Sequence, residues 1–241
     1  RYNMEGTNMR HRKKIIAAYG LVLASLLLFT SVTGCVNKSD GTSGSTLQQI
    51  GGVDGGDNVP TYNQPSQNIS QAMKYFAEKD YDRAISAFQK TLVTNPNQEE
   101  MSIAYSGIGW SKVKKSGVIS DGKNDFQSGY AARSTVKDAK VGLAAAYLLE
   151  DSAKIKEAIS LLESLGRSDT GDVTVINPNF RYVSEIGTGI SNASVHSLLA
   201  TLYYYNNQDS LAKQQLAIAK QEEGDNARIT SIETAIMTLG F

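Results

Sequence analysis

The sequence predicts an all-α protein, built as a short array of about four helix–turn–helix units with one further helix at the C-terminal end. Three observations carry this prediction. From Gln67 onward, apolar residues recur at intervals of three and four, which is the spacing of one helix face. Small residues, mostly alanine, recur at fixed places in these units. Residues 1–66 have a different composition, so they form separate segments before the array.

The start of the chain resembles a secretory signal peptide. Met9 opens the basic stretch MRHRKK, and sixteen uncharged residues follow, from Ile15 to Thr30. A basic start and a short apolar core are typical of secretory signals. The core is shorter than the about 20 apolar residues that a membrane-spanning helix needs. We therefore assign residues 1–34 to a signal peptide, with residues 1–8 as a tag or an overlong start.

The apolar run ends at the only cysteine of the chain. Val32, Thr33, Gly34 and Cys35 resemble a bacterial lipobox, in which the cysteine thiol carries a diacylglyceryl group. The resemblance implies lipidation at Cys35 and membrane anchoring, because two acyl chains hold a protein where one does not. Val36 follows rather than Asp, which implies the outer membrane, facing the periplasm, if the cell has two membranes. A plain transmembrane anchor is the alternative.

The segment after the cysteine, residues 35–66, is expected to be a flexible tether. It is rich in Gly, Ser, Asp and Asn and lacks periodic apolar residues, so it cannot bury enough surface to become ordered. Residues 1–34 hold five of the 24 basic and one of the 24 acidic residues, so residues 35–241 carry 19 and 23, a net charge of −4. Nothing in this charge composition indicates the clustered basic surface that binds a nucleic acid.

The helical pattern is plainest in residues 67–96, where two apolar stripes are separated by the break EKD. The stripes consist of Ile69, Ala72, Met73 and Phe76, and then of Tyr81, Ala84, Ile85, Phe88 and Leu92. Pro96 ends the second stripe, because the residue before a proline is disfavoured in the α region. Ala84 and its counterpart Ala212 are expected where two helices approach closely. A final helix is expected at about 227–239.

This pattern resembles the tetratricopeptide repeat, a 34-residue helix–turn–helix unit. Counted from Pro65, the positions of that family fall on Ala72, Tyr75, Tyr81, Ala84, Phe88 and Pro96, whereas Thr91 departs from the usual alanine. The resemblance implies a helical solenoid over residues 67–241, with repeats near 65–98, 99–136, 137–168 and 193–226. Residues 166–190 do not fit a repeat and contain the β-like VTVI. This insertion is either packed into a joint between repeats or a contact loop.

Candidate catalytic and metal-binding residues are scarce. His196 is the only histidine after residue 34, and packing or a groove contact is favoured there over general-base chemistry. One histidine without a free cysteine cannot form a metal cluster. Residues 121–126 are spaced like the start of a calcium loop, but Lys123 occupies a ligand position and Phe126 replaces the required glycine, so we interpret this stretch as a turn. We therefore expect no catalytic residue, no metal and no cofactor.

The family resemblance implies that the first helix of each repeat lines a concave groove. Only one of the groove positions, Asp138, is charged, so the groove suits an apolar helix or an extended segment. The partner-binding residues implied are Met73, Phe76, Met101, Ile108, Leu148 and Tyr204. If the groove docks a partner, Met73, Phe76, Ile108 and Tyr204 should be partly exposed in the free protein. The alternative is that these residues pack on neighbouring helices.

The favoured function is a non-catalytic, lipid-anchored scaffold or adaptor of the bacterial cell envelope that binds an envelope protein. Two alternatives stay open. One is a lipid-anchored envelope enzyme or enzyme subunit, and the other is a solute-binding lipoprotein.

Overall fold

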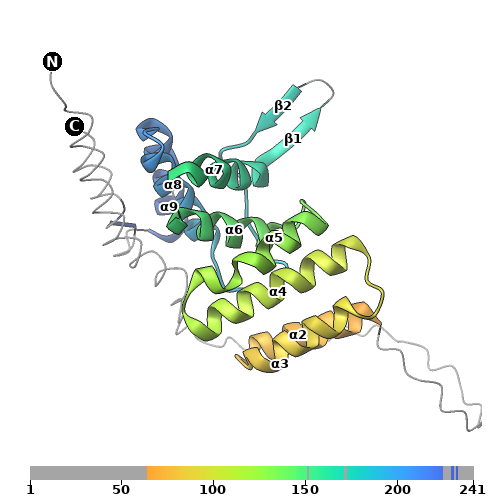
Figure 1. Cartoon of the computed structure of the whole chain (residues 1–241). Helices are drawn as coiled ribbons and strands as arrows, with labels where there is room; N and C mark the ends of the chain where they lie inside the picture. The colour runs from red at the N-terminus through yellow and green to blue at the C-terminus, as the bar shows by residue number, and fades with distance from the viewer. Residues whose placement is uncertain (1–63, 151, 171–172, 225–228, 231, 233–241) are drawn as a thin grey trace, which may run out of the picture.

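The computed structural model describes residues 64–150, 152–170, 173–224, 229–230 and 232 (Figure 1). The predicted signal peptide, Cys35 and nearly all of the tether lie outside these residues, as does most of the predicted final helix. The described part of the chain is all-α apart from one two-stranded sheet, and it contains eight α-helices. No helix in this part is long and apolar enough to cross a membrane.

The eight α-helices form four consecutive pairs, and each pair begins within one residue of the start of a predicted unit. The helices are α2 (Pro65–Ala77), α3 (Tyr81–Leu92), α4 (Gln98–Ser116), α5 (Lys123–Ala132), α6 (Lys137–Glu150), α7 (Ile155–Glu163), α8 (Asn192–Tyr205) and α9 (Asp209–Glu223). Short 3-10 turns lie at Ile119–Gly122, Ser152–Lys154 and Ser164–Gly166. The pairs are layered in chain order, from α2 and α3 at one end to α8 and α9 at the other (Figure 1).

Local sequence explains where α4 begins and ends. The side chain of Asn97 accepts hydrogen bonds from the N–H groups of Glu99 and Glu100, at 2.9 and 3.0 Å, and the carboxylate of Glu100 accepts one from the N–H of Asn97. This reciprocal capping box satisfies backbone donors that a helix start leaves free. At the other end, Gly117 adopts a left-handed conformation with φ of 77°, which is typical of a helix stop.

Small residues allow the helices to pack closely. Ala84 and Ala212 are fully buried, as expected for positions where helices approach each other. Gly107 of α4 faces Phe88 of α3, and a Cβ on Gly107 would lie 2.3 Å from that ring. Glycine is therefore required here if the phenylalanine is to keep its place.

Phe126 of α5 lies in a cage that we call the glycine socket, formed by Gly109, Gly122 and Gly142. A Cβ added to these glycines would lie 2.6, 2.8 and 2.6 Å from the Phe126 ring, respectively. The ring also packs against Trp110, with 5.0 Å between ring centroids. The socket thus brings α4, α5 and α6 into contact around one aromatic side chain. The sequence-based reading of residues 121–126 as a turn is wrong beyond Gly122, because Phe126 belongs to α5.

The insertion begins with a β-hairpin. Strands β1 (Arg167–Thr170) and β2 (Val173–Ile176) pair antiparallel, with Arg167 opposite Ile176 and Thr170 opposite Val173. The prediction of a strand at VTVI is confirmed. The hairpin projects from the helices (Figure 1), and all four residues of β2 are exposed.

The final predicted helix can be followed at only three residues. Residues 229–230 and 232 are helical, and both Ile229 and Ile232 are buried.

Candidate functional site

The residues predicted to line a partner groove are mostly buried. Phe76, Ile108, Leu148 and Tyr204 are only 3–7% exposed and belong to the hydrophobic core. The expectation of partial exposure is therefore wrong at Phe76, Ile108 and Tyr204. The physical reason is that these first-helix faces pack into the core. Met73 and Met101 are half-buried, and a role for them in partner binding stays a prediction.

The second half of the insertion contributes to this core. Phe180, Tyr182, Ile186 and Ile190 are all buried, although residues 177–191 form neither helix nor strand. Tyr182 also donates its backbone N–H to the side-chain oxygen of Asn192, at the start of α8, at 2.6 Å. This half of the insertion is packed, in contrast to the exposed hairpin that precedes it.

Asp138 and Glu185 bind each other's backbone, an arrangement that we call the Asp138–Glu185 clasp. Oδ2 of Asp138 accepts the N–H groups of Glu185 and Ile186, at 2.7 and 3.0 Å. The Glu185 carboxylate accepts the N–H groups of Lys137 and Asp138, at 3.1 Å. The Tyr182 hydroxyl donates to Oδ1 of Asp138. Because the first N–H groups of a helix have no partner within it, Glu185 caps α6 from a distant part of the chain.

Burial decides the protonation of this clasp. It raises the pKa of Asp138 from 3.8 to about 7, against the hydrogen bond from Tyr182 and with the added repulsion of Glu185. Burial also raises the pKa of the Tyr182 hydroxyl, which therefore stays protonated and able to donate. Between about pH 4 and pH 7, Asp138 is protonated in the folded chain and ionised in the unfolded chain. The contribution of Asp138 to the free energy of unfolding therefore falls as the pH rises through this range.

His196 has a packing role, which is one of the two roles that the sequence favoured. The residue is fully buried in α8, and its ring stacks on Phe180 with 4.4 Å between centroids. Nε2 lies 3.0 Å from the carbonyl oxygen of Phe180, and Nδ1 lies 2.6 Å from Oε1 of Gln215 in α9. Both ring nitrogens are thus occupied within the fold, so His196 has no open face for a substrate.

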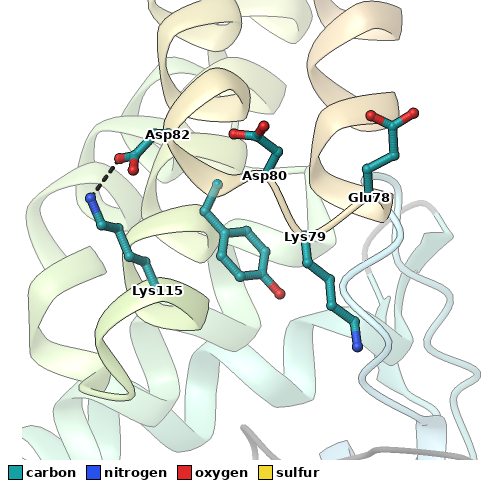
Figure 2. Close-up of a pocket in the computed structure, with 6 residues that line it drawn as sticks. Glu78, Lys79, Asp80, Asp82 and Lys115 are labelled. Carbon is teal, nitrogen blue, oxygen red and sulfur yellow. Dashed lines mark hydrogen bonds and ion pairs between the residues drawn. The ribbon is translucent and has the colours of Figure 1, made fainter.

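One open pocket lies at the turn between α2 and α3, with a volume of about 400 Å³ (Figure 2). Asp82 and Lys115 point toward each other across it and form an ion pair of 2.5 Å, which joins α3 to α4. Asp80 caps α3 by accepting the N–H of Arg83 at 3.1 Å, and hydrogen bonds from Arg83 lower the pKa of its carboxyl. Asp80 and Asp82 therefore have structural roles at this pocket.

A second open pocket is a groove of about 460 Å³ between α2 and α3. The residues that line it are mostly polar: Gln67, Asn68, Gln71, Tyr75, Arg83, Ser86, Ala87 and Lys90. Two of them are cations, and none is a carboxylate. The Arg83 guanidinium lies 4.7 Å from the centre of the Tyr75 ring, which holds it along the groove. Lys90 is exposed and makes no ion pair with any described residue.

The α2–α3 groove was not expected from the sequence, because the apolar stripes identify only the core-facing side of each helix. A signal was present on the opposite face of α2, where Gln67, Gln71 and Tyr75 recur every four residues. The sequence contains no such signal for the Asp138–Glu185 clasp, since the two carboxylates lie 47 residues apart in the chain. Among the residues that the structure describes, no group of three or more His, Cys, Asp or Glu could hold a metal ion.

Comparison with models of known protein families and with curated protein sequences finds no match to this chain.

Proposed function

We propose that this chain is a non-catalytic, lipid-anchored scaffold of the bacterial cell envelope, and that it binds an acidic segment of an envelope protein in the α2–α3 groove. The observation that carries the proposal is the groove itself, an open surface lined by Arg83 and Lys90 without a carboxylate.

The arrangement of the helices supports a repeat scaffold. The chain has four consecutive helix pairs, and the first two begin 33 residues apart, at Pro65 and Gln98, close to the 34 residues of a tetratricopeptide repeat. Helical repeat proteins present extended binding surfaces. The lipobox-like sequence before Cys35 supports a membrane anchor. Because α2 and α3 are the helix pair nearest to Cys35 in the sequence, the proposed docking surface would lie close to the tether.

The chemistry of the groove supports an acidic partner segment. The amides of Gln67 and Gln71 can donate hydrogen bonds, and the guanidinium and ammonium groups of Arg83 and Lys90 add charge-assisted donors. Asp80 already binds Arg83, so Lys90 is the cation with its charge most available to a ligand. Charged groups on such a surface orient the partner and increase the association rate, and they contribute less to the binding affinity itself.

The test is photocrosslinking of the full-length chain in cells. A photoreactive amino acid replaces Gln71 in the groove, and in a second chain it replaces the exposed Ser160 on α7. We expect an adduct with an envelope protein from position 71 only, cross-linked through an acidic peptide that mass spectrometry identifies.

The control variants separate the groove from general basic charge. Lys90→Glu reverses a charge inside the groove, whereas Lys74→Glu reverses one on α2 outside it. Since both lysines are exposed, neither change should affect folding. We expect Lys90→Glu to reduce the yield of the cross-linked adduct at least several-fold, and Lys74→Glu to leave that yield unchanged. Equal loss in both variants, or loss in neither, would contradict docking at the groove.

A further inference from the structure

The two strands of the hairpin differ in the charge that they carry at the sheet edge. Strand β1 contains Arg167 and Asp169, whose side chains form an ion pair of 3.0 Å. Strand β2 has the sequence VTVI, with no charge and no proline. Natural sheets protect exposed edges with charged residues, prolines or bulges. Among the described strands, β1 has such protection and β2 does not.

The hydrogen-bond pattern shows which backbone groups β2 presents outward. The N–H of Asn177 donates to the carbonyl of Gly166, so these residues form a hydrogen-bonded pair. Bonded and non-bonded pairs alternate along an antiparallel ladder. In the observed register, the N–H and C=O groups of Thr174 and Ile176 therefore point away from β1. No hydrogen bond from these outward groups to another described residue is present.

The apolar side chains of β2 are exposed beside this free edge. Val173 is 59% exposed, Val175 49% and Ile176 43%. Side chains alternate between the faces of a strand, so Val173 and Val175 share one face while Thr174 and Ile176 share the other. The hairpin stands clear of the helices (Figure 1), which leaves space along β2 for another strand.

We propose that β2 pairs antiparallel with β2 of a second copy of this chain, about a twofold axis through Val175. In this register, Thr174 of each copy lies opposite Ile176 of the other, and the outward groups of both residues form the hydrogen-bonded pairs. Val175 then lies opposite Val175 of the second copy in the non-bonded pair, where side chains are closest. The same surface thus serves both copies, as a twofold interface requires.

The charge distribution explains why the partner strand belongs to a second copy of this chain and why the assembly stops at two copies. The uncharged edge of β2 meets an identical uncharged edge. The two cross-strand rows that flank the central Val175 row each have Arg167 of one copy at one end and Asp169 of the other copy at the other end. No like charges face each other. The four-stranded sheet would end in β1 on both sides, and the charged side chains there oppose the addition of a further strand.

The contact is small, which predicts a weak dimer. Stable interfaces bury about 800 Å² on each partner, and four edge residues with partly exposed side chains supply less than this. A covalent trap is therefore the appropriate measurement, because it accumulates a dimer that is present only part of the time.

The experiment uses disulfide trapping of full-length chains in membranes, under mild oxidation, read on a non-reducing gel. In the Val175→Cys variant the two cysteines face each other within the about 4.4–6.8 Å between Cα atoms that a disulfide allows. In the Val173→Cys variant they are four residues apart along the strands, about 13 Å, and out of reach. The unsubstituted chain is the control, because any dimer band that it gives must come from a disulfide through Cys35, its only cysteine. We expect a strong dimer band from Val175→Cys alone.

Two further variants test strand pairing within the Val175→Cys chain. Thr174→Pro removes an outward N–H without removing a hydrogen bond to β1, and it should abolish the dimer band. Thr174→Ala keeps that N–H and should retain the band. The proposal is overturned if Val175→Cys gives no band above the unchanged chain, if Val173→Cys gives an equal band, or if Thr174→Pro has no effect. None of these results depends on partner docking at the α2–α3 groove.

Discussion

Replacing Gly142 with alanine tests the glycine socket, where two opposing effects can be weighed. In an exposed helix interior, alanine is more favourable than glycine by about 1 kcal/mol. At Gly142 the added Cβ would lie 2.6 Å from the Phe126 ring, about 1 Å inside ordinary contact between carbon atoms. The ring cannot retreat, because Gly109 and Gly122 surround it and Trp110 packs against it.

Overpacking of a well-packed core costs about 1–3 kcal/mol, and the lack of free space around Phe126 favours the upper part of that range. After subtracting the helix-propensity gain, we expect Gly142→Ala to lower the free energy of unfolding by about 1–2 kcal/mol. For a protein of this size that corresponds to a fall in melting temperature of roughly 2–8 °C. Thermal and urea unfolding of the full-length chain, followed by circular dichroism, would measure it.

A double-mutant cycle identifies the cause. Phe126→Leu removes ring atoms that Gly142→Ala would contact, so the alanine should cost less in the Phe126→Leu chain than in the unchanged chain. Asn124→Ala, at an exposed position of α5, serves as a control that adds helix propensity without contact. If Gly142→Ala stabilised the protein as much as an exposed substitution does, the socket argument would be refuted.

Two other predictions concern the anchor and the clasp. Cys35→Ser should abolish incorporation of a fatty-acid probe and leave an unprocessed precursor on a gel, whereas equal labelling of both chains would contradict lipidation at this residue. Burial of Asp138 predicts that the free energy of unfolding falls between pH 4 and pH 7, by on the order of a few kcal/mol. Asp138→Asn resembles the protonated acid and cannot titrate, so this fall should be smaller in the variant. Urea unfolding at pH 5 and pH 8 would measure it, and parallel pH curves for the two chains would count against the argument.

The features that could be predicted from the sequence are those set by neighbouring residues. The apolar stripes around Ile69 and Phe88 predicted α2 and α3, because helix periodicity depends on residues three and four apart. The break EKD and Pro96 predicted where these helices end. The VTVI stretch predicted a strand, since β-branched residues favour extended backbone.

The features that the sequence did not show depend on contacts between distant segments. Strand β1 has the sequence RSDT, which carries no β signal of its own, and it forms a strand because β2 pairs with it. The sequence placed Asp138 on an open groove, but Glu185 and Ile186 of the insertion cover it. Phe76 and Ile108 were likewise expected to face a partner, and they pack into the core instead. Helix periodicity identifies the apolar face of a helix but not what covers that face.

The Asp138–Glu185 clasp has a consequence for how the array folds and unfolds. Repeat arrays are held by contacts between adjacent units, so their parts can open one at a time from an end. The clasp joins residues 47 apart in the chain and closes a loop that contains most of α6, all of α7 and the hairpin. The third helix pair therefore cannot loosen without releasing the insertion, and the insertion in turn is tied to α8 through Asn192. The middle and the C-terminal part of the array should open as one cooperative unit, whereas α2 and α3 can fray on their own.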